Sequence, residues 1–269
     1  MTSSLSSPTR RALTLGALGT AALSLAACGG GGSSPATTVD PTSYGGGLVP
    51  GSVLLTITHR VTMTVSMPDT TGVDWSTIDL DGFNALPLVS MTINVGLDAI
   101  HAPLSTQNFL AYLNSGAYKN TIFHRVIPSF VAQGGGYTDT DGTDTHIATN
   151  AAIGLESRNG ITNSKGTLAM ARTTDPNSAT SEFFFNLVDN GYQRDPITGA
   201  LVLDSTGAPT PILNYPGQDG TGGYAVFGTV LDQTSLDTLT AIAGEPTGTN
   251  GSASDWPIRD ITVTAISID

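Results

Sequence analysis

A cation and an amide stand eight positions apart in an otherwise apolar run, residues 123–136. Arg125 and Gln133 are its polar donors, and Phe130 and Val131 are among its apolar side chains. An unpaired buried guanidinium is too costly to keep, so Arg125 must reach water, pair with an acid or point its donors into a cleft. Apolar side chains with a few convergent donors are typical of a site that orients a ligand, although the run also suits a plain β-strand with an arginine at its rim.

Two later segments carry side chains that suit the same site. Residues 166–172 are small and apolar and end in a second cation, Arg172. Glu182 is followed by three consecutive phenylalanines, which must face both sides of a sheet. Phe184 is therefore available to a pocket on the face opposite the core.

Other chemistries have weaker support in the sequence. The four histidines and many serines come without a Gly-x-Ser-x-Gly elbow, so a hydrolase is disfavoured. No His, Cys or acidic cluster has metal-ligand spacing, and residues 134–136, three glycines, lack the lysine and helix of a phosphate-binding loop. We therefore expect no metal and no cofactor.

The composition favours a loop-rich β domain. The chain has 269 residues, 39% of them hydrophobic and only 12% charged, with 32 glycines. This charged fraction is about half the usual value. The length allows one large or two small domains with a real core.

The N-terminal residues predict export and lipidation. Residues 1–27 combine Arg10 and Arg11 with a short apolar stretch, as in a signal peptide, and the sequence up to Cys28 resembles the lipobox of bacterial lipoproteins. Cys28 is the only cysteine, so no disulfide can form within the chain. An ordinary cleaved signal with an incidental cysteine is the alternative, and the arginine pair leaves both the Sec and the twin-arginine routes open.

The predicted domain organisation follows from these features. Residues 28–50 are rich in Gly, Ser, Thr and Pro and read as a flexible tether, which leaves residues 51–269 as the folded domain. We expect a monomer in the bacterial cell envelope, anchored to a membrane through the lipid on Cys28. Removing residues 1–27 would change the formal net charge from −12 to −14, which disfavours binding to nucleic acid.

The alternation of apolar and polar residues predicts a mainly β fold. We expect strands over residues 61–67, 88–95, 123–133, 166–172, 183–186, 223–230 and 258–268, short helices over 104–113 and 236–244, and loops over 69–86, 134–149 and 193–222. About eight strands without a βαβ rhythm indicate an all-β fold, a closed eight-stranded antiparallel β-barrel with two short capping α-helices.

Taken together, these segments resemble the cyclophilin family of peptidyl-prolyl cis/trans isomerases, and specifically its exported bacterial members. The resemblance covers about residues 53–268 and rests on ordered motifs: Asn108-Phe109, residues 123–136, 166–172, 178–184 and 223–228. It implies an enzyme that accelerates rotation about X–Pro bonds in proline-containing polypeptides, with a substrate groove on the outer surface of the barrel.

The resemblance also assigns roles to individual residues. Arg125 matches the catalytic arginine, and His124 is expected to be structural. The pocket for the substrate proline matches Phe130, Val131, Phe184 and Tyr192. The positions that line the groove and bind the peptide backbone match Gln133, Ala171, Arg172 and Tyr224.

Four features depart from the family pattern, and one of them is Val131 in place of the more usual methionine. Glu182, which is also expected among the substrate-binding residues, stands where most members carry glutamine and is expected to pair with Arg125 or Arg172. Tyr192 replaces a tryptophan, which implies weak sensitivity to cyclosporin, and the insertion over residues 193–222 is unusually long. The alternative function is therefore a peptide-binding chaperone module on the same scaffold with little catalysis.

Overall fold

The computed structural model describes residues 37–39, 52–140 and 142–269. These residues belong to one compact unit, Ala36–Asp269. The predicted signal peptide, the lipidation site Cys28 and most of the predicted tether lie outside the described residues.

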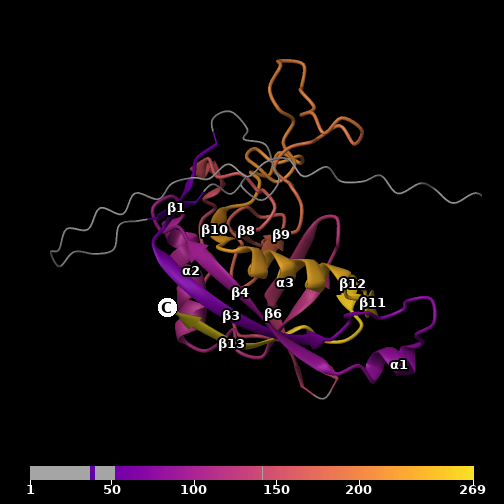
Figure 1. Ribbon diagram of the computed structural model, residues 1–269. Coiled ribbons are helices and arrows are strands. Elements are labelled where there is room, and N and C mark those ends of the chain that lie inside the picture. The colour runs from indigo at the N-terminus through magenta and orange to yellow at the C-terminus, as the bar shows by residue number, and fades with distance from the viewer. Residues whose placement is uncertain (1–36, 40–51, 141) are drawn as a thin grey trace, which may run out of the picture. The chain divides into compact units, whose positions relative to one another are not determined.

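Eight antiparallel strands close into a barrel, as the sequence predicted (Figure 1). Their order around the barrel is β5-β13-β3-β4-β10-β8-β9-β6, and the pairing of β5 with β6 closes the ring. The barrel strands are β3 (His59–Pro68), β4 (Leu88–Leu97), β5 (Thr121–Val126), β6 (Val131–Thr140), β8 (Thr167–Met170), β9 (Phe183–Asn186), β10 (Val226–Val230) and β13 (Thr262–Ile268).

The remaining strands lie outside this ring. Strand β7 (Thr143–His146) pairs with β6 and extends the sheet at that point. Two separate two-stranded sheets join β1 (Thr37–Val39) to β2 (Leu55–Ile57) and β11 (Thr247–Asn250) to β12 (Ala253–Pro257).

Both predicted helices are present, with α2 at Pro103–Asn114 and α3 at Gln233–Gly244. A third helix, α1 (Leu80–Asn84), lies in the segment 69–86, where only a loop was expected. Its start is capped by Asp79, whose carboxylate accepts a hydrogen bond from the Gly82 N–H at 2.8 Å. A short 3₁₀ helix covers Ser157–Asn159, and no helix among the described residues is long and apolar enough to span a membrane.

The core fills the inside of the barrel. Alternate residues of β3, such as Val61 and Met63, are fully buried there, as the period of two predicts. Phe109 of α2 and Leu239 of α3 belong to the same cluster, so both helices close the core. A second, smaller apolar cluster contains Val131, Ala171 and Phe184.

The expected single strand over residues 123–133 was wrong, because this segment is a hairpin. Strand β5 ends at Val126, the chain turns through residues 127–130, and β6 begins at Val131. Pro128 in the turn has no N–H to give to a ladder, and the Ile127 N–H donates to the Val131 carbonyl at 2.9 Å to close the turn. The expected loop over residues 134–149 also proved partly wrong, since it contains the end of β6 and all of β7.

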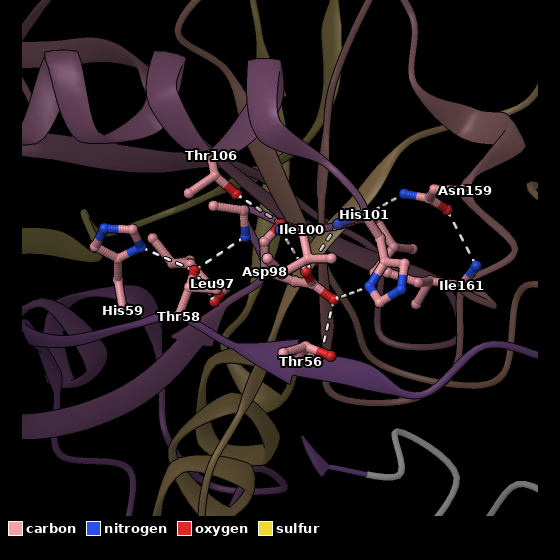
Figure 2. A network of polar contacts seen from close by, with 12 residues as sticks. Thr56, Thr58, His59, Leu97, Asp98, Ile100, His101, Thr106, Asn159 and Ile161 are labelled. Carbon is pink, nitrogen blue, oxygen red and sulfur yellow. Dashed lines mark hydrogen bonds and ion pairs between the residues drawn. The ribbon is translucent and has the colours of Figure 1, made fainter. Parts of the chain in front are cut away.

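A fully buried carboxylate fixes the connection from β4 to α2 (Figure 2). Asp98 accepts hydrogen bonds from the backbone N–H groups of Thr56, Ile100 and His101 at 2.8–2.9 Å. Its Oδ2 also lies 2.7 Å from the His101 Nδ1. A buried charge needs such partners to offset its lost hydration, and here they tie β2 to the start of α2.

Candidate active site

The strand register places the predicted polar and aromatic site residues in one row. Arg125 of β5 is the direct cross-strand partner of Gln133 of β6, and Gln133 is the partner of Phe184 of β9. Phe183 and Phe185 point into the barrel core, whereas Phe184 joins the second apolar cluster. This alternation brings three side chains that are far apart in sequence to one face of the barrel.

A groove of about 140 Å³ lies over this row. Eight of its nine lining residues were expected there, and the ninth is Leu213. The lining consists of Arg125, Phe130, Val131, Gln133, Ala171, Arg172, Phe184, Leu213 and Tyr224. Pockets for drug-sized ligands hold roughly 300–1,000 Å³, so this groove suits one side chain of a longer chain rather than a cofactor.

Arg125 is only partly buried and has few partners. Its Nη1 donates to the Gln133 Oε1 over a long 3.5 Å, and its guanidinium carbon lies 5.9 Å from the centre of the Phe130 ring. Within the described part of the chain it makes no ion pair with an acid. Most of its donors therefore stay available to a ligand in the groove.

Arg172 is held differently. Its Nε and Nη2 donate to the Gly223 carbonyl at 3.0 and 2.8 Å, and Nη2 also donates to the Thr221 hydroxyl at 2.7 Å. Its guanidinium carbon lies 4.4 Å from the centre of the Tyr224 ring. Arg172 thus fixes one rim of the groove with donors that are already engaged.

A chain of buried asparagines links Phe130 to Tyr224, two residues that line the groove. Asn190 donates to the Phe130 carbonyl and to the Asn186 Oδ1, both at 2.8 Å. Asn186 donates to the Asn163 Oδ1 at 3.2 Å, and Asn163 donates to the Tyr224 carbonyl at 3.3 Å. Phe130 and Tyr224 are thereby joined through side-chain amides alone.

Two expected site residues lie elsewhere. Tyr192 lines a neighbouring pocket with Arg158, Asn214 and Tyr215 instead of the groove. Glu182 stands beside Gln133 but is not in the groove lining, and the described residues give it no arginine partner. The expected pairing of Glu182 with Arg125 or Arg172 was therefore wrong.

Leu213 was not expected in the groove, because it lies inside the long segment 193–222, which was predicted to be a loop. That segment carries no clear strand period, and the structure holds it with isolated bridges such as Tyr192 to Pro211. A hydrogen bond of 2.8 Å from the Tyr224 N–H to the Leu213 carbonyl holds this leucine beside the groove residue Tyr224.

The arrangement can bind and orient without forming a covalent bond. The groove offers one accessible guanidinium, one amide and an apolar floor of Phe130, Val131 and Phe184. Among the described residues, no three His, Cys, Asp or Glu side chains form a group that could hold a metal ion.

Comparison with known proteins identifies the family of this chain. Residues 89–268 match the family model "Cyclophilin type peptidyl-prolyl cis-trans isomerase/CLD". The chain belongs to the cyclophilin family. It is accordingly an enzyme, a peptidyl-prolyl cis-trans isomerase, and the matched region runs from β4 to β13, with β3 just outside it.

Individual cyclophilin relatives cover most of this domain. A peptidyl-prolyl cis-trans isomerase of Acinetobacter baylyi is 38% identical over 67% of this chain and 85% of its own. Peptidyl-prolyl cis-trans isomerase B of Escherichia coli is 39% identical over 62% of this chain and 87% of its own. A crystal structure of a cyclophilin type isomerase from Cryptosporidium parvum, in the presence of the dipeptide Ala-Pro, covers 66% of this chain and 92% of its own at 28% identity and a TM-score of 0.45.

Proposed function

We propose that this isomerase rotates X–Pro bonds of exported polypeptides, with Arg125 as the hydrogen-bond donor that stabilises the twisted amide. The observation that carries the proposal is the cross-strand pair of Arg125 and Gln133 beside the apolar floor of the groove.

The chemistry requires little beyond such a donor. An X–Pro amide resists rotation with a barrier of about 20 kcal/mol, because the nitrogen shares its lone pair with the carbonyl. In the twisted transition state that lone pair is localised on nitrogen and becomes a better hydrogen-bond acceptor. One preorganised donor aimed at developing charge can contribute about 3–4 kcal/mol.

The apolar floor has a complementary role. A proline ring held against Phe130, Val131 and Phe184 would be kept from turning while the preceding carbonyl swings. Because Phe184 and Val131 are almost completely buried, this floor is already packed before a substrate arrives. Orientation and exclusion of water would then add to the effect of Arg125.

Measured isomerisation tests this function directly. We expect the purified protein to accelerate cis/trans exchange of a short Ala-Pro peptide, and Arg125→Ala to lose nearly all of that acceleration. Arg60→Ala is a matched control, since Arg60 is an exposed arginine on β3. Peptide binding by the unaltered protein without faster exchange would favour the chaperone module instead.

The cellular setting is a second part of the proposal. The signal-like residues 1–27, the lipobox-like sequence up to Cys28 and the Gly/Ser-rich tether support a lipoprotein of the bacterial envelope. In a bacterial host, the unaltered chain should partition with membranes and Cys28→Ser should be released in soluble form. Equal partitioning of the two proteins would refute the lipid anchor.

A further inference from the structure

Glu182 has three polar neighbours, Gln133, His124 and His146. Its Oε2 accepts a hydrogen bond from the Gln133 Nε2 at 2.7 Å. The Nε2 atoms of His124 and His146 each lie 3.4 Å from one of its oxygens. The Glu182 side chain is 23% exposed, so these contacts are only partly screened by water.

The hydrogen bond to Gln133 determines which way that amide points. An ionised carboxylate can only accept, so it must face the NH₂ end of the glutamine. The other end of the amide, Oε1, is then directed toward Arg125, whose Nη1 lies 3.5 Å away. A glutamine at position 182 could pair with either end of the Gln133 amide and would leave this choice open.

We propose that Glu182 is a positioning residue, which fixes the Gln133 amide so that its oxygen faces Arg125 and holds the guanidinium over the groove. Glu182 acts through Gln133 and does not itself line the groove. This inference rests on the proposed role of Arg125.

Two features of its surroundings favour this position of the Glu182 side chain. A Cβ on Gly136 would lie 2.6 Å from the Glu182 Oε1 and 2.8 Å from its Cδ, so the absence of a side chain there makes room for the carboxylate. The buried ring of His124 packs against Tyr137 and Trp256, with ring centres 4.8 and 5.6 Å away.

The charge state of Glu182 agrees with this role. Burial favours its neutral form, but hydrogen bonds from His124, Gln133 and His146 outweigh that effect and lower the pKa of Glu182 below its ordinary value. The side chain is therefore an acceptor-only carboxylate at neutral pH.

A double-mutant cycle tests the inference on the full chain, with exchange of a short Ala-Pro peptide as the assay. We expect Glu182→Ala to lower kcat/KM roughly five- to tenfold, a coupling of the size seen for residues in one hydrogen-bond network. In a Gln133→Ala background the same change should have almost no further effect. Glu182→Gln, which keeps an acceptor, should retain more activity than Glu182→Ala.

NMR spectroscopy of the side chains adds a structural measurement to the kinetics. The side-chain NH₂ signals of Gln133 and the Nε–H signal of Arg125 should shift in Glu182→Ala. The matched control is Asp237→Ala, which breaks a similar carboxylate–glutamine bond of 2.9 Å, to Gln233 on the exposed face of α3, and should leave activity and both signals unchanged.

Two outcomes would overturn the inference: an equal loss of activity in the native and Gln133→Ala backgrounds, or full activity of Glu182→Ala. The second outcome combined with an inactive Arg125→Ala would leave the proposed function intact and reject only the role of Glu182. A fully active Arg125→Ala would reject the proposed function itself.

Discussion

Asn186→Ala tests how much the buried asparagine chain contributes to the stability of the domain. In the native protein Asn186 donates to the Asn163 Oδ1 at 3.2 Å and to the Thr167 hydroxyl at 2.9 Å, and it accepts from Asn190 at 2.8 Å. All of these residues are buried. The substitution therefore removes three hydrogen bonds from a site that water does not reach.

The size of the effect follows from what is left unpaired. The Asn163 Oδ1 has no other hydrogen-bond donor among the described residues, and a buried polar atom without a partner costs about 1–3 kcal/mol. Asn190 keeps its bond to the Phe130 carbonyl but loses one partner. We expect the free energy of unfolding to fall by about 2–4 kcal/mol in total, a large part of the about 5–15 kcal/mol typical of a domain.

Urea unfolding at 25 °C, followed by tryptophan fluorescence, measures this difference. Asn114→Ala is the control, because Asn114 is exposed in the last turn of α2 and its loss should change stability by less than about 0.5 kcal/mol. If Asn186→Ala were as stable as Asn114→Ala, the hydrogen bonds of the asparagine chain would not contribute to the stability of the domain.

The remaining predictions concern a buried acid and the rim of the groove. Burial raises the pKa of Glu245 from 4.5 to about 7, so the folded state binds this proton more tightly than the unfolded state and stability falls as pH rises from 4.5 to 7. Glu245→Gln should therefore have a higher melting temperature than the native protein at pH 8 but not at pH 4. An equal difference in melting temperature at the two pH values would contradict this prediction. Arg172→Lys should raise KM roughly fivefold with a smaller change in kcat, because lysine cannot make both bonds to the Gly223 carbonyl and stack on Tyr224. A KM equal to that of the native protein would show that this rim does not depend on Arg172.

The barrel was predictable because its signals are local. The strict alternation of Val61, Met63 and Val65 specifies a half-buried strand, and the spacing of Leu236 and Leu239 specifies a helix face. The hairpin over residues 121–140 was missed, since a proline turn interrupts a run whose hydrophobicity is continuous. Helix α1 was missed because it has only five residues and depends on the Asp79 cap more than on an apolar face.

The site was predictable only in part because it is assembled by register. Arg125, Gln133 and Phe184 could be selected by residue type, and the barrel then makes them neighbours. The partners of Glu182 could not be chosen this way, since His146 comes from β7, a strand within a segment that was expected to be a loop. Tyr192 was expected in the groove and lies outside it, whereas Leu213 lines the groove and was not expected there. Neither position could be predicted, because the path of residues 193–222 is set by isolated bridges and loop hydrogen bonds.

We propose that Arg125 stabilises the twisted amide and is not merely a binding group. Exchange spectroscopy on an Ala-Pro peptide measures affinity and cis/trans exchange in one experiment, for the native protein and for Arg125→Ala. We predict a Kd changed by less than about threefold and an exchange rate lowered roughly 10²- to 10³-fold, as expected for the loss of one preorganised donor. Weakened binding with an unchanged exchange rate in the bound state would contradict the account.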